Sequence, residues 1–346
     1  MRLLPRPSAA LAVTVVTALA VLPTAALAAE TPGAAGFTIT DPRIRESSGL
    51  AASRLHPGVY WTHNDSDDGP YVYGVDAATG RTVARVTLTG IGTPRDVEAI
   101  SVGPDGQLYV GDIGDNRDGT WDHVWVYRFP EPKRLADTTV KAEQFTVTYA
   151  DGPRDAEALM VHPVTGRVYI ASKHERTAGL YEGPERLSAG GTNVFRRVAD
   201  VPWVTDGAFS PDGGRLTLRG YFTARTWPWK DGRPQGAGTR VSAPFQGQAE
   251  SVTYTADGKT LMFGSEGAGS RVIAVPATPD DGSSAADPAA SAPAPSDAAS
   301  GRPGSPPQAG DPAGQDGGFT KGALVLVVGT ALVFGAKRLL RRTPKD

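Results

Sequence analysis

The sequence contains no cysteine and only five histidines. The absence of cysteine excludes disulfide bonds and thiolate metal sites, and the few histidines disfavour a zinc site. No GxSxG, HExxH or Walker motif occurs, so several common catalytic sites are not indicated. The formal net charge is only -2 and there is no basic tract, so nucleic acid is not an expected partner. Nothing in the pattern indicates an oligomer.

The N-terminal segment has the pattern of a secretory signal peptide. Arg2 and Arg6 precede an apolar run from Ala9 to Leu22, and Ala26-Leu27-Ala28 supplies a small-x-small cleavage site. We therefore predict a signal peptide over residues 1–29. An uncleaved anchor is the alternative.

A second apolar run, from Gly322 to Ala336, lies near the C-terminus. It is slightly short for a spanning helix, but Leu339 and Leu340 extend it, and we predict a transmembrane anchor over residues 321–340. The basic residues on its C-terminal side predict a cytoplasmic tail over 341–346. The expected location is the cell membrane, with a single pass and the large domain outside. A helix that lies in the membrane interface is the alternative.

Residues 278–318 consist almost entirely of Ala, Pro, Ser, Gly and Asp. Such a segment cannot bury enough apolar surface to offset its chain entropy, so we predict a disordered linker. The remaining stretch, residues 37–277, is left as the folded domain.

One element recurs five times in this domain: a short alternating run, a tight turn and a second β-rich run. The turn of each copy contains a glycine, as hairpin turns require. The copies begin at Ser48, Glu98, Glu157, Thr205 and Glu250.

Further strand-like runs follow each copy, and helical periodicity is almost absent. Four strands for each of about five repeats predict an all-β fold, a β-propeller with four-stranded blades. Five blades are expected, and six remain possible if the stretch from Arg117 to Asp151 hides another. The last copy ends after its third strand, so we predict that an N-terminal strand within Phe37–Ile44 closes the ring. An open sandwich is the structural alternative.

The first strand of each blade lines the channel of a propeller, so the residues that begin these strands should converge. They are Ser48, Glu98, Glu157, the pair Thr205-Asp206 and Glu250. Carboxylates directed at one axis repel each other strongly and need compensation. Ca²⁺ is bound by oxygen ligands, and we predict that Ser48, Glu98, Glu157, Asp206 and Glu250 hold such an ion. Glutamates around a water-filled channel are the alternative.

The loops that follow the second strands should lie around the same end of the channel, which we call its mouth. Their candidate ligand-binding residues are Asn64, Asp112, Lys173, His174, Arg219 and Glu266. Of these, Lys173 and Arg219 could hold an anion such as phosphate or carboxylate. Each residue alone has the alternative of being solvated loop surface. The segment Thr226–Trp229 allows either an exposed sugar-binding patch or a packed plug between blades.

The segment DVEAISVGPDGQLYVGDIGDN and its sister copies resemble the blades of calcium-dependent apyrases, which are five-bladed nucleotidases. This resemblance implies a channel calcium on Ser48, Glu98, Glu157 and Glu250, whereas Thr205-Asp206 departs from the family pattern. The copies are also similar to phytase-like esterase propellers and to gluconolactonase-type propellers, which use a metal at the same place. Fold similarity of this kind does not fix a reaction.

Two functions fit these observations. One is a metal-dependent hydrolase of a phosphoester or another ester, in which Ca²⁺ polarises the substrate and Glu98 or Glu157 serves as base. The other is a non-catalytic propeller that binds a glycan, a peptide or an envelope partner. The expected partner is accordingly a small anionic ligand or a component of the cell envelope.

Overall fold

The computed structural model describes residues 35–66, 68–117, 119–174 and 176–277. Every regular element in these ranges is a β-strand, which agrees with the predicted all-β class. Within the same ranges there is no helix that could span a membrane. The segments that lie outside the described residues are the predicted signal peptide (1–29), linker (278–318), anchor (321–340) and tail (341–346).

The first sequence copy forms an antiparallel sheet in chain order, with one later strand added at its outer edge. Its strands are β2 (Ser47–Ala52), β3 (Val59–Asn64), β4 (Tyr71–Asp76), β5 (Arg81–Thr89) and β9 (Thr138–Lys141). The added strand, β9, pairs in parallel with β5, where Val86 lies opposite Thr138.

The second and third copies share one sheet because their outermost strands pair. The strands are β6 (Val97–Val102), β7 (Gln107–Asp112), β8 (Val124–Pro130), β10 (Glu143–Tyr149), β11 (Ala156–Val161), β12 (Val168–Ser172), β13 (Gly179–Glu182) and β14 (Thr192–Asp200). The joining pair is β10 and β14, in parallel, with Thr146 opposite Thr192. The stretch from Arg117 to Asp151, which the sequence allowed as a further blade, supplies β8, β9 and β10 to the first two groups.

The fourth copy forms β15 (Asp206–Phe209), β16 (Arg215–Arg219), β17 (Ala224–Lys230), β18 (Arg233–Pro234) and β19 (Thr239–Val241). The fifth forms β20 (Ser251–Tyr254), β21 (Thr260–Gly264) and β22 (Arg271–Pro276). The outer strand of this last sheet is β1 (Phe37–Thr38), which pairs antiparallel with β22, Phe37 opposite Val272. The two ends of the described domain therefore meet in one sheet, as the sequence predicts.

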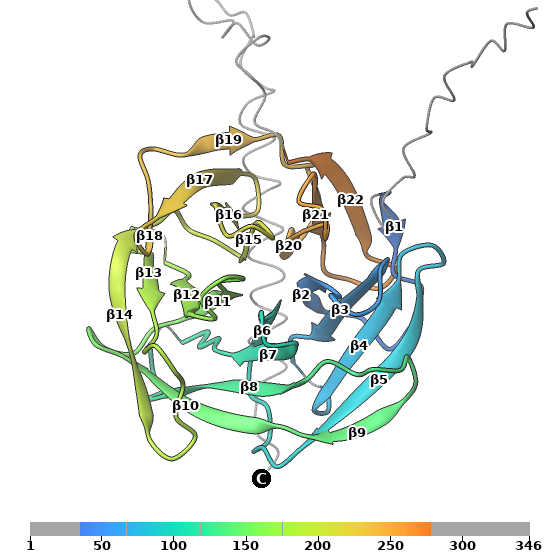
Figure 1. The fold of residues 1–346 in the computed structure, drawn as a ribbon, viewed down its shortest axis with the longest axis horizontal. Helices are drawn as coiled ribbons and strands as arrows, with labels where there is room; N and C mark the ends of the chain where they lie inside the picture. The colour runs from blue at the N-terminus through green and yellow to red at the C-terminus, as the bar shows by residue number, and fades with distance from the viewer. Residues whose placement is uncertain (1–34, 67, 118, 175, 278–346) are drawn as a thin grey trace, which may run out of the picture. The chain divides into compact units, whose positions relative to one another are not determined.

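The first strands of the copies surround a common centre, and the later strands of each sheet lie progressively farther out (Figure 1). β2 packs against β6 on one side and β20 on the other, while β11 and β15 complete the circle of neighbours. This closed, propeller-like arrangement excludes the open sandwich. It also brings the starts of all five first strands to one end of the centre.

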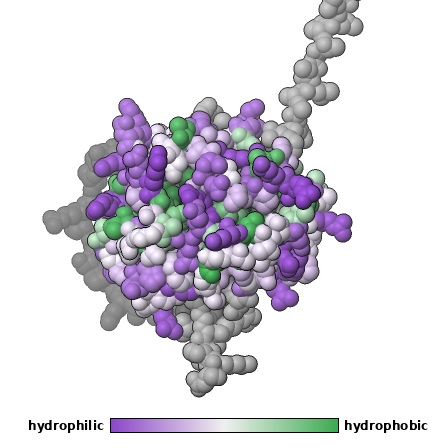
Figure 2. Space-filling view, turned by 60° about the horizontal axis from the view of Figure 1, so that its bottom comes forward, coloured by the Kyte–Doolittle hydropathy of each residue, from purple (hydrophilic) through white to green (hydrophobic). Residues whose placement is uncertain are grey.

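The hydrophobic core is divided among the spaces between neighbouring sheets. Trp61, fully buried, packs with Val110 and Tyr127 between the first and second groups. Trp227 belongs to the cluster between the third and fourth groups, and the Trp229 ring lies 4.8 Å from that of Phe209. The tryptophan-rich segment is therefore a packed plug, and the sugar-patch alternative is wrong. Figure 2 shows one side of the surface, where hydrophobic residues occur in small areas among hydrophilic ones.

The predicted hairpin turns are present in all five copies. Each contains a glycine with positive φ, namely Gly58, Gly106, Gly166, Gly213 and Gly258. L-residues with a side chain rarely adopt this conformation, so these turns depend on glycine. Because the turns fix the register of the first two strands, they also fix where each first strand begins.

We expect Gly106→Ala to lower the free energy of unfolding by about 1–2 kcal/mol. An added Cβ at Gly106 would touch nothing within 4 Å, so only the left-handed backbone (φ +70°) opposes it. Gly190→Ala is the matched control, because Gly190 is equally open and has no positive φ. Equal denaturant midpoints for the two variants would contradict this account of the turns.

Candidate functional site

Three of the first strands carry a β-bulge near the point where they begin. The strand register shifts between Ser47 and Leu50 in β2, between Val97 and Ala99 in β6, and between Ala156 and Ala158 in β11. The residues inside these shifts include Ser48, Glu98 and Glu157. A bulge leaves a residue out of the ladder and can turn its side chain in a new direction, so the local backbone contributes to the placement of these side chains.

Ser48, Glu98 and Glu157 are almost completely buried. The Ser48 hydroxyl donates a hydrogen bond of 3.0 Å to Oε2 of Glu98, which joins the first and second groups. Glu98 and Glu157 are close enough that their charges interact. The predicted convergence of these residues is therefore present in the structure.

In the fourth copy the sequence did not decide whether Thr205 or Asp206 occupies the position at the start of the first strand. Thr205 donates its hydroxyl hydrogen bond to the carbonyl of Ala249 at 2.7 Å, so it joins two loops. Asp206 is the buried carboxylate: its Oδ2 accepts a 2.8 Å hydrogen bond from the Val252 amide, and its charge interacts with that of Glu250. Among the described residues, Oδ1 of Asp206 and Oε2 of Glu250 are buried without a hydrogen-bond partner.

Lys173 supplies a positive charge to this carboxylate group. Its Nζ lies 2.5 Å from Oε1 of Glu157, and its charge also interacts with Glu98 and Glu250. The Nζ atom is 5.5 Å from the centre of the Trp203 ring and 5.9 Å from that of Tyr221. Lys173 is thus held at the centre of the cluster.

Burial and mutual repulsion disturb the titration of these groups. Burial, followed by the charge of Glu98, raises the pKa of Glu157 well above its usual value. Burial likewise raises the pKa of Asp206. Burial opposes the charged form of Lys173, but the combined effect of Glu157, Tyr221, Glu250 and Glu98 outweighs burial and raises the pKa of Lys173. The lysine therefore stays charged while the carboxylates compete for protons.

Two groups of carboxylates have the spacing of a metal site. Ligand oxygens of Asp65, Asp96 and Glu98, all buried, lie within 4.8 Å of one another, and so do those of Glu46, Asp65 and Glu266. Two oxygens that bind one Ca²⁺ at about 2.4 Å can be at most about 4.8 Å apart. The two groups share Asp65, which lies directly after β3, so the site connects the first, second and fifth copies.

Of the residues predicted to hold an ion, Glu98 belongs to one of these groups, whereas Glu46, Asp65 and Asp96 were missed as candidate ligands. A signal for Glu46 and Asp96 was available, because they each lie two residues before the predicted inner residue of their copy, Ser48 and Glu98. Residues two apart in an extended chain lie on the same side. Asp155 has the same position before Glu157, but it accepts a 2.7 Å hydrogen bond from the Asp115 amide.

Two of the predicted ligand-binding residues, Asn64 and Asp112, use their side chains for hydrogen bonds within the fold. Asn64 Oδ1 accepts hydrogen bonds from the amides of Arg45 and Glu46. Asp112 accepts bonds from the amides of Arg95 and Asp96 and from the Tyr127 hydroxyl. Both residues thus hold the backbone that carries the carboxylates of the candidate metal site. They act on the site through its supporting loops.

Arg219 also has a structural environment. Its Nη1 donates to the carbonyls of Ser251 and Gly264, both at 2.6 Å, and its Nη2 donates to Gln246. Burial lowers its pKa to about 10. Arg219 joins the fourth and fifth copies, and the structure gives no support for its predicted contact with an anion.

The other two predicted residues differ in position. His174 is near the surface, where its Nδ1 accepts hydrogen bonds from the amides of Arg176 and Thr177. Glu266 belongs to the second carboxylate group and also accepts a hydrogen bond from Gln248. Of the six residues predicted to bind a ligand, Lys173 and Glu266 therefore join the cluster directly.

A row of aromatic side chains borders the cluster beside Lys173. The Trp203 and Tyr221 rings are 4.7 Å apart, and Tyr221 interacts with Glu250. Next to Tyr221, the rings of Phe222 and Phe245 are stacked 6.2 Å apart and are 59% and 80% exposed. These two rings form an exposed apolar area beside the cluster.

We expect Asp206→Asn to stabilise the metal-free protein above about pH 4, by on the order of 1 kcal/mol or more. The folded-state pKa of Asp206 is raised by burial, so ionisation opposes folding and stability falls as pH rises between the unfolded and folded pKa values. Asparagine keeps an acceptor for the Val252 amide and removes the charge.

Asp212→Asn provides the contrast, because hydrogen bonds from Ser210 and Gly214 lower the pKa of Asp212. That variant should lose stability at neutral pH, since a depressed pKa stabilises the fold above the unfolded value. The measurement is thermal unfolding in EDTA from pH 4 to 9. A destabilised Asp206→Asn would contradict this prediction.

Comparison with known proteins gives fold similarity only. No family model matches the sequence, and no curated protein matches it. A PQQ-bound aldose sugar dehydrogenase from Streptomyces coelicolor superposes with a TM-score of 0.40 and 14% identity, over 70% of this chain and 98% of that one. A gluconolactonase from Xanthomonas campestris gives a TM-score of 0.44 and 16% identity, over 70% and 80%. Hydrazine synthase from Kuenenia stuttgartiensis gives 0.36 and 14%, over 62% and 60%.

Proposed function

We propose that the protein is a metal-dependent hydrolase that acts on an anionic ester, most simply a phosphoester. The carrying observation is the buried group of Asp65, Asp96 and Glu98, whose ligand oxygens lie within 4.8 Å of one another. We also infer that the five strand groups are five blades of one propeller, since their first strands form one closed circle.

The chemistry of the donors supports a hard divalent cation. All the candidate ligands are carboxylate oxygens, with the Ser48 hydroxyl beside them, and Ca²⁺ accepts six to eight such oxygens. The lysine that could otherwise neutralise them is paired with Glu157. Asp65, Asp96 and Glu98 would hold Ca²⁺, with Glu46 and Glu266 at its side. Bound there, the ion would polarise an ester oxygen of the substrate.

Glu157 is the best candidate for proton transfer. It lies beside the metal group, and its raised pKa lets it hold a proton closer to neutral pH than an ordinary glutamate. Lys173 keeps its charge and contacts Glu157, so it fixes that carboxyl and attracts an anionic substrate to the mouth. As the bond between phosphorus and the leaving oxygen breaks, Glu157 would donate its proton to that oxygen, and the water that forms the new P–O bond would release a proton to solvent, from which Glu157 is protonated again.

A test uses the purified full chain, with bound metal measured by elemental analysis and thermal shift recorded against EDTA. Asp96→Asn and Glu98→Gln should lose metal and the EDTA-sensitive shift. Glu157→Gln should keep metal and lose turnover of β-glycerophosphate by about 100-fold or more, because its alkoxide leaving group needs the proton that Glu157 would donate. Asp105→Asn is the matched control, because Asp105 lies in a hairpin turn and accepts a hydrogen bond from Tyr109.

Wild-type protein that retains no metal and shows no EDTA effect would refute the metal site. Retained metal without turnover of phosphate, carboxylate or lactone esters would instead favour the second candidate, a propeller that binds an envelope glycan or peptide. The specific support for this second candidate is the exposed aromatic pair Phe222 and Phe245 beside the cluster. In this second candidate, the ion would hold the loops that carry the carboxylates in place and would have no catalytic role.

We propose, from the sequence of the two ends, that the protein is exported and held in the cell membrane by residues 321–340. In cells that make the full chain, a stop codon at position 319 should move the protein from the membrane pellet to the medium. A chain that stays in the membrane fraction after this truncation would contradict the proposed anchor.

A further inference from the structure

A cavity lies at the end of the first strands that is opposite to the carboxylate cluster. It has a volume of about 330 Å³ and is partly open to solvent. All five first strands, or the residues that directly follow them, contribute to its wall. Representative lining residues are Leu50, Arg54, Ser101, Val161, Phe209 and Thr253. Six residues of extended chain span about 20 Å, so Arg54 lies far from Ser48 and its cluster.

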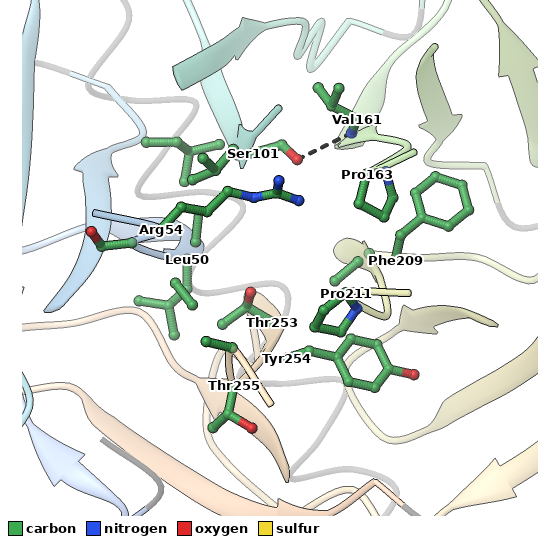
Figure 3. A pocket seen from close by; sticks show the side chains of 18 residues that line it. Leu50, Arg54, Ser101, Val161, Pro163, Phe209, Pro211, Thr253, Tyr254 and Thr255 are labelled. Carbon is green, nitrogen blue, oxygen red and sulfur yellow. Dashed lines mark hydrogen bonds between the residues drawn. The ribbon is translucent and has the colours of Figure 1, made fainter. Parts of the chain in front are cut away.

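Most residues that line this cavity have apolar side chains, although polar atoms of the backbone and of hydroxyl side chains make up about half of its exposed wall. Leu50, Ile100, Val161 and Phe209 contribute hydrocarbon side chains from four different copies. Figure 3 shows Leu50, Val161 and Phe209 around one open space, with two prolines, Pro163 and Pro211, beside Phe209. Pockets for small molecules are usually concave and apolar with a few polar groups, and their volumes begin near about 300 Å³.

Arg54 is the only charged residue among those that line the cavity. Its guanidinium extends into the open space (Figure 3). Arg54 makes no hydrogen bond or ion pair with the rest of the described chain, unlike Arg219 at the other end. A guanidinium beside an apolar wall is a selective partner for a carboxylate, which it can bind through two parallel hydrogen bonds.

Some of the hydroxyl groups in the wall already form hydrogen bonds within the protein. Ser101 accepts a hydrogen bond from the Val161 amide, and Thr255 donates to Asp257. Thr253 has no hydrogen-bond partner from its side chain within the described residues, and in Figure 3 its hydroxyl faces the same space as Arg54. Arg54 and Thr253 are therefore the two lining side chains whose polar groups are available to a ligand beside the apolar side chains.

We propose that this cavity is a binding site for a monocarboxylate with a small apolar body. The single cation matches a single negative charge, whereas a phosphate dianion would need further positive groups. The apolar body would occupy the space between Leu50, Ile100 and Phe209. The site is separate from the proposed hydrolase centre and does not depend on its metal.

The test is calorimetric titration of the purified full chain with cyclohexanecarboxylate. Three probes separate the contributions: acetate lacks the apolar body, cyclohexanemethanol lacks the charge, and cyclohexylammonium reverses it. Cyclohexanecarboxylate should bind saturably and at least about 10-fold more tightly than each of these, a factor that corresponds to about 1.4 kcal/mol. EDTA should leave its affinity unchanged, even if EDTA abolishes hydrolysis.

Variants locate the site. Arg54→Gln should weaken binding at least 10-fold, Arg54→Lys less, and Thr253→Val by a few-fold, with unchanged melting temperatures for the exposed Arg54 variants. Arg81→Gln is the matched control, because Arg81 is an exposed arginine at the start of β5. The proposal is overturned by wild-type protein without saturable binding, by equal affinity for the four probes, or by equal affinities of Arg54→Gln and Arg81→Gln.

Discussion

Closure of the ring is the constraint on which the rest of the structure depends. The pairing of β1 with β22, Phe37 opposite Val272, completes the last sheet with residues from the start of the domain. Buried residues of both partners, including Phe37 and Val272, enter the core cluster between the fifth and first groups. This pairing keeps the last sheet beside the first, so that β2 packs against β20. The carboxylates at the starts of the first strands depend on the same arrangement for their positions.

Closure has an electrostatic consequence. It brings Glu98, Glu157, Asp206 and Glu250 to one end of the centre, where each carboxylate loses water and meets the others. Lys173 offsets part of this repulsion, through a 2.5 Å contact with Glu157. Asp65 and Asp96, both buried, place two further carboxylates near Glu98. A buried charge excess of this kind is costly in a fold without a ligand, and it is ordinary in a fold that binds a cation.

The opposite end of the same strands has the reverse character. Its wall combines apolar side chains with neutral polar groups, and its single charged residue, Arg54, is positive. The two ends differ because successive stretches of one short strand face different surroundings: Ser48 begins β2 among carboxylates, and Arg54 follows it among hydrocarbon groups. One set of strands thus separates two chemically distinct mouths.

Much of the architecture was predictable because it rests on local rules. The glycine turns, the alternating runs and the need for an N-terminal strand are all visible in the chain, and the structure contains each of them. Ser48, Glu98 and Glu157 were identified by their position at the start of a strand. The choice of Asp206 over Thr205 needed the structure, because Thr205 turns to bond Ala249.

The sequence by itself determined the all-β class, the repeat and the set of carboxylates that could converge, since these depend on residue type and spacing along the chain. Only the tertiary structure decided which of them share a site. Glu46 and Asp65 belong to the first copy and Glu266 to the fifth, so the proximity of Glu266 to the other two results from ring closure. Arg219 shows the same limit, because only packing shows that its donors face the carbonyls of Ser251 and Gly264 and not a ligand. The spacing of residues along the chain determines which side chains each strand carries, and ring closure determines which residues of other copies they contact.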